Sequence, residues 1–148
     1  MRQYIRILVL VAAAAIVGAC DEGLSSIAGP TPNLTPTFAS IQSDILEAGD
    51  SSGRSLCIGC HTNVGRTPAG GLNLIHDAAY DQLVNVSSIQ RPGTPRVVPG
   101  NPDASYLVQK IEGTQTVGLR MPRNGPPYLT QGQILIIRRW IEIGAPRN

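Results

Sequence analysis

The feature that most constrains this chain is a five-residue motif in which two cysteines are followed at once by a histidine. The motif reads Cys57-Ile58-Gly59-Cys60-His61, which is the pattern C-x-x-C-H. This spacing is the attachment signature of c-type haem. The two intervening residues let both thiols face the vinyl groups on one porphyrin edge, and the next residue carries an imidazole towards the iron. The sequence therefore predicts a covalent haem c on Cys57 and Cys60, with His61 as an axial ligand.

Other chemistries use a similar pair of cysteines. A thioredoxin-like motif needs an alternation of strands and helices around it, and the sequence pattern shows none. A zinc site needs about four protein ligands, and beyond the leader and Cys20 the chain offers only four soft candidates: Cys57, Cys60, His61 and His76. A disulfide between Cys57 and Cys60 leaves His61 without a role. The sequence therefore favours haem over all three.

The scarcity of aromatic residues also suits a core that is completed by a cofactor. The 148 residues include one Phe, one Trp and four Tyr, against 16 Gly and 12 Pro. A domain of this size normally fills its core with large apolar side chains. Either the fold is rich in loops or the core is completed by something other than protein, and a haem would supply the missing apolar volume.

The N-terminus has the order of a secretory signal. Arg2 and Arg6 come first, and an apolar run from Ile7 to Ala19 follows, which is too short to span a bilayer comfortably. The sequence Val17-Gly18-Ala19-Cys20 resembles a bacterial lipoprotein cleavage site. That resemblance implies a diacylglyceryl group on the thiol of Cys20, and several acyl chains make a stable anchor. The alternative is an ordinary signal peptide with a chance cysteine.

This interpretation divides the chain into three parts: a lipoprotein signal peptide (1–19), a lipidated cysteine with a flexible tether (20–36), and one domain (37–148). The tether is rich in Ser, Thr, Pro and Gly, as flexible linkers are. Without the leader the chain has ten basic and ten acidic residues, which argues against nucleic-acid binding. We expect an exported protein, anchored at a membrane and facing the periplasm or the cell exterior.

The second axial ligand is predicted to be Met121, the only methionine besides Met1. Pro122 follows it and stiffens the loop that presents the sulfur. A thioether ligand raises the reduction potential of haem iron. Two alternatives stay open, namely that Met121 fills the core and that His76 is the sixth ligand.

Four segments have the pattern of helices, and the Gly/Pro-rich loops between them make strands unlikely. The first begins at Phe38 and ends at Gly49, and the second covers 77–85. The third begins at Asn101-Pro102-Asp103, with Asn as cap and Pro at the first helical position, and ends at Gly113. The fourth begins with a capping box of Thr130 and Gln133 and ends at Gly144. The expected fold class is all-α.

The order of these features resembles small bacterial cytochrome c domains of the planctomycete type and, more broadly, class I cytochrome c. The resemblance covers roughly 37–146. Besides the C-x-x-C-H motif and the helices it includes Gly70-Gly71-Leu72, Val98-Pro99-Gly100-Asn101-Pro102, Ser105-Tyr106-Leu107, Met121-Pro122, Trp140-Ile141 and Gly144-Ala145. It implies a cytochrome c-like fold in which the first and last helices cross beside the haem, with His61 as proximal and Met121 as distal ligand. A polar insertion at 50–55 departs from the family, in which the first helix commonly runs closer to the motif.

The same resemblance bears on three residues that follow the motif. In related cytochromes a proline carbonyl accepts the Nδ1–H of the proximal histidine, and such a partner fixes the ring. Pro68 is the candidate here, and the alternative is a proline that only shapes the loop. Leu72 and Leu74 would pack on the haem face or take ordinary core positions.

The predicted function is electron transfer between redox partners rather than enzymatic catalysis. A haem closed on both axial sides has no place for substrate at the iron. Arg120 and Arg123 flank Met121, and they either favour an acidic partner or serve only to pair haem propionates and solvate the loop. The alternatives are a haem protein whose open sixth site binds peroxide or a gas, and an accessory haem subunit of a larger complex.

Overall fold

The computed structural model of this chain describes residues 35–49 and 52–148, which belong to one compact unit, Thr31–Asn148. The predictions for the leader and for Cys20 lie outside these residues. The described part contains four α-helices, three short 3₁₀ or π-helical turns and no β-strand, with two isolated bridges. The all-α class is therefore confirmed. No helix in that part is long and apolar enough to cross a membrane.

The first helical run is present but ends earlier than predicted. It consists of α3 (Phe38–Ile41) and a π-helical turn (Gln42–Leu46). Thr37 caps its start, because its hydroxyl accepts a hydrogen bond from the N–H of Ser40 at 3.2 Å. The run stops before Gly49. The guanidinium of Arg54 donates to the carbonyls of Ile45 and Ala48 at 3.1 and 3.0 Å, so these carbonyls need no further helical turn.

The two middle helices are shorter than their sequence patterns. Helix α4 covers Ala79–Leu83, and α5 covers Tyr106–Glu112. The predicted start at Asn101 is wrong by about one turn. Asn101 caps a separate turn, in which its side chain accepts from the N–H of Ala104, and Ser105 precedes α5 instead. The end is confirmed, since Gly113 has a φ of 85°, a left-handed conformation that favours glycine.

The last helix agrees with its prediction most closely. Helix α6 covers Gln131–Glu142. Thr130 and Gln133 form the complete capping box, in which the side chain of each binds the backbone N–H of the other. Gly144, after the helix, has a φ of 101°. A local signal that combines two side chains, as here, depends little on the rest of the fold.

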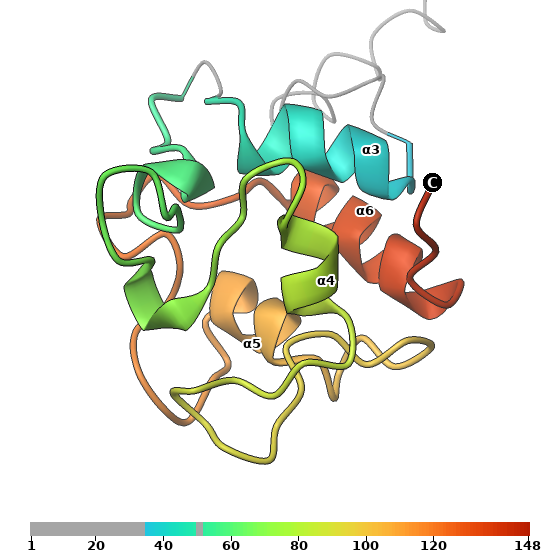
Figure 1. The fold of residues 1–148 in the computed structure, drawn as a ribbon. Helices are drawn as coiled ribbons and strands as arrows, with labels where there is room; N and C mark the ends of the chain where they lie inside the picture. Colours follow the sequence, from blue (N-terminus) through green and yellow to red (C-terminus); the bar gives the residue numbers. More distant parts are fainter. Residues whose placement is uncertain (1–34, 50–51) are drawn as a thin grey trace, which may run out of the picture. The chain divides into compact units, whose positions relative to one another are not determined.

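An aromatic cluster joins α3, α4 and α6, which gather on the right of Figure 1. The ring centroid of Phe38 lies 5.1 Å from that of Tyr80 and 5.3 Å from that of Trp140. Trp140 is fully buried, and its indole N–H donates to the carbonyl of Pro146 at 2.9 Å. The first and last helices therefore pack against each other, which agrees with one part of what the resemblance implies.

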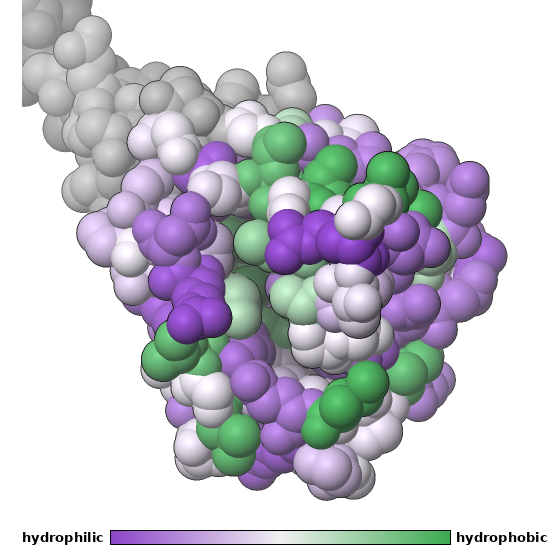
Figure 2. Space-filling model, turned by 60° about the vertical axis from the view of Figure 1, so that its left-hand side comes forward, coloured by the Kyte–Doolittle hydropathy of each residue, from purple (hydrophilic) through white to green (hydrophobic). Residues whose placement is uncertain are grey.

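The other side of the domain consists mainly of loops. The segments around 57–75 and 114–128 lie on the left of Figure 1. Figure 2 turns this side forward and shows it hollowed, with pale green, moderately hydrophobic atoms inside the recess and hydrophilic atoms along much of its rim. The C-x-x-C-H motif and Met121 both belong to this side.

Candidate functional site

The motif is held in a single tight turn. Cys57–Gly59 forms a 3₁₀ helix, and the carbonyl of Cys57 accepts hydrogen bonds from the N–H groups of Cys60 and His61 at 3.2 and 2.9 Å. Both cysteines are free, Cys57 half-buried and Cys60 exposed. The alternative of a Cys57–Cys60 disulfide is therefore not realised. The turn therefore holds the backbone of both cysteines and of His61 in one short, hydrogen-bonded segment.

The imidazole of His61 is fixed by the loop that follows it. Its Nδ1 lies 3.0 Å from the carbonyl oxygen of Ala69. The expectation that Pro68 supplies this carbonyl is wrong by one residue. The N–H of Ala69 donates to the carbonyl of Cys60, which folds the loop back, and the carbonyl of Pro68 is used by the N–H of Gly71. Pro68 thus shapes the turn, and its neighbour holds the ring.

The surroundings of His61 favour a neutral ring. Burial lowers its pKa below the usual value, and the hydrogen bonds to the backbone of Ala69 and Leu72 oppose this only in part. The positive charges of Arg96 and Lys110 lower the pKa further. A neutral imidazole that donates Nδ1–H to a carbonyl has its lone pair on Nε2. This is the protonation state that a metal-ligating histidine requires.

Arg54 connects the first helix to the first cysteine. One guanidinium nitrogen donates to the carbonyls of Ile45 and Ala48, and the other lies 3.8 Å from the Sγ of Cys57. Burial raises the pKa of the Cys57 thiol, and the charge of Arg54 opposes this effect. Arg54 is itself 3% exposed. The sequence analysis identified the polar insertion but did not predict that Arg54 bridges the first helix and Cys57. The only signal for this contact was a single cation three residues before the motif.

Met121 lies in a loop that is tied to the end of α5. Its N–H donates to the carbonyl of Lys110 at 2.8 Å. The preceding Arg120 donates from Nε to the carbonyl of Ile111, and its guanidinium carbon lies 3.9 Å from the ring centroid of Tyr128. Arg120 therefore stabilises the loop. Met121 itself is half-buried.

The methionine loop and the motif meet at one hydrogen bond. The side-chain amide of Asn124, three residues after Met121, donates to the hydroxyl of Ser55, two residues before Cys57. The fold therefore brings the elements of both expected axial ligands to the same side of the domain. The rival ligand His76 is exposed, and its Nδ1 lies 3.9 Å from a carboxylate oxygen of Glu47.

Two further expectations concern metal and apolar residues. In residues 35–49 and 52–148, no three His, Cys, Asp or Glu side chains gather as a metal site, so the zinc alternative gains no support.

Leu74 is a core residue with 3% exposure, and Leu72 is half-buried against the same core. Leu74 thus takes the ordinary core position that was one of its two expected roles.

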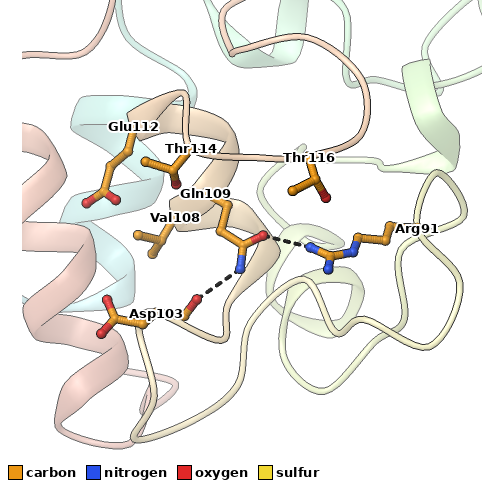
Figure 3. Close-up of a pocket in the computed structure, with 7 residues that line it drawn as sticks. All are labelled: Arg91, Asp103, Val108, Gln109, Glu112, Thr114 and Thr116. Carbon is orange, nitrogen blue, oxygen red and sulfur yellow. Dashed lines mark hydrogen bonds between the residues drawn. The ribbon is translucent and has the colours of Figure 1, made fainter.

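A separate cavity of about 400 Å³ lies beside α5 (Figure 3). Gln109 crosses it, accepting from Arg91 at 3.0 Å and donating to the carbonyl of Asp103 at 2.9 Å. Its other lining residues are Val108, Glu112, Thr114 and Thr116. The lining contains no cysteine, histidine or methionine, so this cavity contributes nothing to the donor set around His61.

Comparisons of this chain with protein-family models, with curated proteins and with solved structures found no match. Its function has to be inferred from the site itself.

Proposed function

We propose that this chain is a membrane-anchored monohaem c-type cytochrome that transfers single electrons between redox partners outside the cytoplasm. The observation that carries the proposal is the state of His61. It follows two free thiols in a single turn, its ring is oriented by Ala69, and its surroundings favour the neutral, ligating form. We propose a cytochrome c-like arrangement for the all-α fold around it.

Each part of the site has a role in this proposal. Cys57 and Cys60 would hold the porphyrin edge through thioether bonds, formed as each S–H adds across a vinyl group. His61 and Met121 would be the axial ligands. When bound, the haem supplies a one-electron couple between ferric and ferrous iron. The hydrogen bond between Asn124 and Ser55 supports this assignment, because it links the two ligand-bearing elements.

The loop side of the domain also suits docking of a redox partner. Several large hydrophobic residues are exposed in its loops: Leu56, Val64, Ile89, Val117 and Leu119. Because Arg120 is engaged with Tyr128, Arg123 is the exposed cation of the pair that flanks Met121. We propose that a partner approaches this side, with Arg123 favouring an acidic contact.

The test of haem attachment is the double variant Cys57→Ala/Cys60→Ala. We expect covalent haem to be lost, and the domain to fail to fold, because no protein side chain replaces the porphyrin. Haem-stained gel electrophoresis under denaturing conditions measures this directly. A double variant that still stains would show that the thiols do not attach the haem.

The test of anchoring is Cys20→Ser. The variant removes the thiol that would carry lipid, so the protein is expected in the soluble exported fraction with its haem signal retained. Membrane fractionation with a high-salt wash separates lipid anchoring from electrostatic adhesion. Retention of the variant on washed membranes would contradict the lipid assignment.

A further inference from the structure

Lys110 stands apart from every other cation of the chain. It is the only lysine in the sequence, and the other eleven basic residues are all arginines. It lies on α5 and is 8% exposed. Burial of an ammonium group is unfavourable unless an anion or several hydrogen-bond acceptors compensate for the lost water. The position of the one lysine therefore calls for an explanation.

The contacts of Lys110 compensate for this burial only in part. Its Nζ donates to Oε1 of Gln90 at 2.8 Å and lies 5.5 Å from the ring centroid of Tyr106. An ammonium carries three N–H donors. Within the part of the chain that the structure describes, no carboxylate forms an ion pair with Lys110. Desolvation accordingly lowers its pKa.

Arg96 provides a comparison, because it is also a buried cation whose charge acts on His61. Its guanidinium donates to the carbonyl of Gln82 at 2.8 Å and to that of Gly71 at 3.3 Å. Arg96 thus has several carbonyl acceptors and holds the loop beyond His61 in place. Lys110 has one side-chain amide and retains donors that an anion could use.

Lys110 is also linked to both expected axial ligands. Its carbonyl accepts from the N–H of Met121 at 2.8 Å, and its positive charge is one of those that act on His61. An anion bound to this ammonium would therefore lie on the side of the domain where we propose the haem. Haem carries two propionate carboxylates, which are anions that an ammonium can pair with through charge-assisted hydrogen bonds.

We propose that Lys110, supported by Gln90 and Tyr106, is the binding residue for a haem propionate. The proposal rests on the proposed function, since it requires haem in the hollow. The ion pair would satisfy the remaining N–H donors of the ammonium. The positive charge held near the iron would also favour the ferrous state, which carries one positive charge fewer than the ferric state.

The experiment compares wild type with Lys110→Gln, Lys110→Arg and the control Arg139→Gln, which removes the same charge from an exposed position on α6. Haem staining of the wild type comes first, because its absence would overturn the proposed function itself. In Lys110→Gln we expect the equilibrium constant for reduction to fall about tenfold, which is about 59 mV for one electron. The propionate carboxylate bands in the redox-difference infrared spectrum should shift as well. Lys110→Arg should keep a reduction potential close to that of the wild type. Arg139→Gln should change neither the reduction potential nor the carboxylate bands.

Unchanged carboxylate bands in Lys110→Gln would overturn the assignment, whether or not the potential changes, because a charge acting only through space leaves these bands in place. If Lys110→Gln fails to fold, ¹⁵N-lysine labelling of the wild type decides instead, since the chain gives a single Nζ signal. We expect that signal to differ between ferric and ferrous protein and to exchange slowly with water. The same signal in both states would place Lys110 away from the haem and overturn the proposal.

Discussion

Where α3, α4 and α6 meet, large side chains fill the space between the helices, and Ile41, Ile137 and Trp140 are at most 1% exposed. On the loop side, by contrast, Val64 is 72% and Ile89 67% exposed, and the surface is hollowed (Figure 2). The two regions belong to one chain but are stabilised differently. Packed apolar side chains stabilise the helical side, whereas hydrogen bonds and capped carbonyls stabilise the loops around the hollow.

The difference indicates which part of the domain depends on a bound group. A well-packed protein interior needs no further component. The loop side is hollowed (Figure 2) and carries two free thiols and an oriented imidazole, and we propose haem as the group that it binds. If haem binds there, substitutions on the helical side should change stability, and loop-side substitutions that leave haem attachment intact should change the properties of the iron.

The largest expected effect is that of Trp140→Ala. Removal of a fully buried indole leaves a cavity among α3, α4 and α6 and should lower the free energy of unfolding by about 3–5 kcal/mol. Denaturant unfolding of the haem-bearing protein measures this. The control Val64→Ala, on the loop side, should change little because its side chain is exposed. Equal losses in both variants would remove the distinction between the two sides.

The next largest effect is expected on the reduction potential when Met121 is replaced, with no change in the packing of the helical side. Met121→His replaces a thioether with a stronger donor that favours ferric iron, so the reduction potential should fall by about 0.1 V or more. Met121→Ala should make the ferric haem partly high-spin and admit carbon monoxide to the ferrous form. Redox titration with optical spectra measures both. If neither variant changes potential or spectrum, Met121 is not a ligand and His76 becomes the leading candidate.

A smaller effect is expected for Arg54→Met, at the border of the two regions. The change leaves the buried carbonyl of Ile45 and the partly buried carbonyl of Ala48 without the guanidinium donor that now caps them, which should cost about 1–3 kcal/mol of stability. Thermal and denaturant unfolding measure this loss. Arg66→Met is the matched control, since Arg66 is exposed and donates to the carbonyl of Gly59. A loss in the control as large as in Arg54→Met would show that these carbonyls are not the cause.

The sequence predicted the features that depend on neighbouring residues. The capping box of Thr130 and Gln133 and the end of α5 at Gly113 are local signals, and the structure confirms both. The start of α5 was not predictable in this way. Ser105 binds both the N–H of Val98 and the carbonyl of Asn101, so the chain turns there before the helix begins.

At the candidate site, too, the sequence predicted local features but not the contacts that depend on the fold. The motif residues Cys57, Cys60 and His61 could be identified from their spacing alone. The carbonyl that orients His61 was assigned one residue too early, because hydrogen bonds within the loop decide which carbonyl reaches the ring. The partnership of Gln90 with Lys110 joins residues 20 apart through side chains, and no periodic pattern reports such a contact.

The most direct test of the central claim is an optical spectrum of the purified protein, oxidised and reduced, after expression in a host that exports proteins and attaches haem to them. The account predicts a covalently held low-spin haem, with a weak band near the red edge in the oxidised state that is typical of thioether ligation. Purified, folded protein with no haem absorption would contradict it.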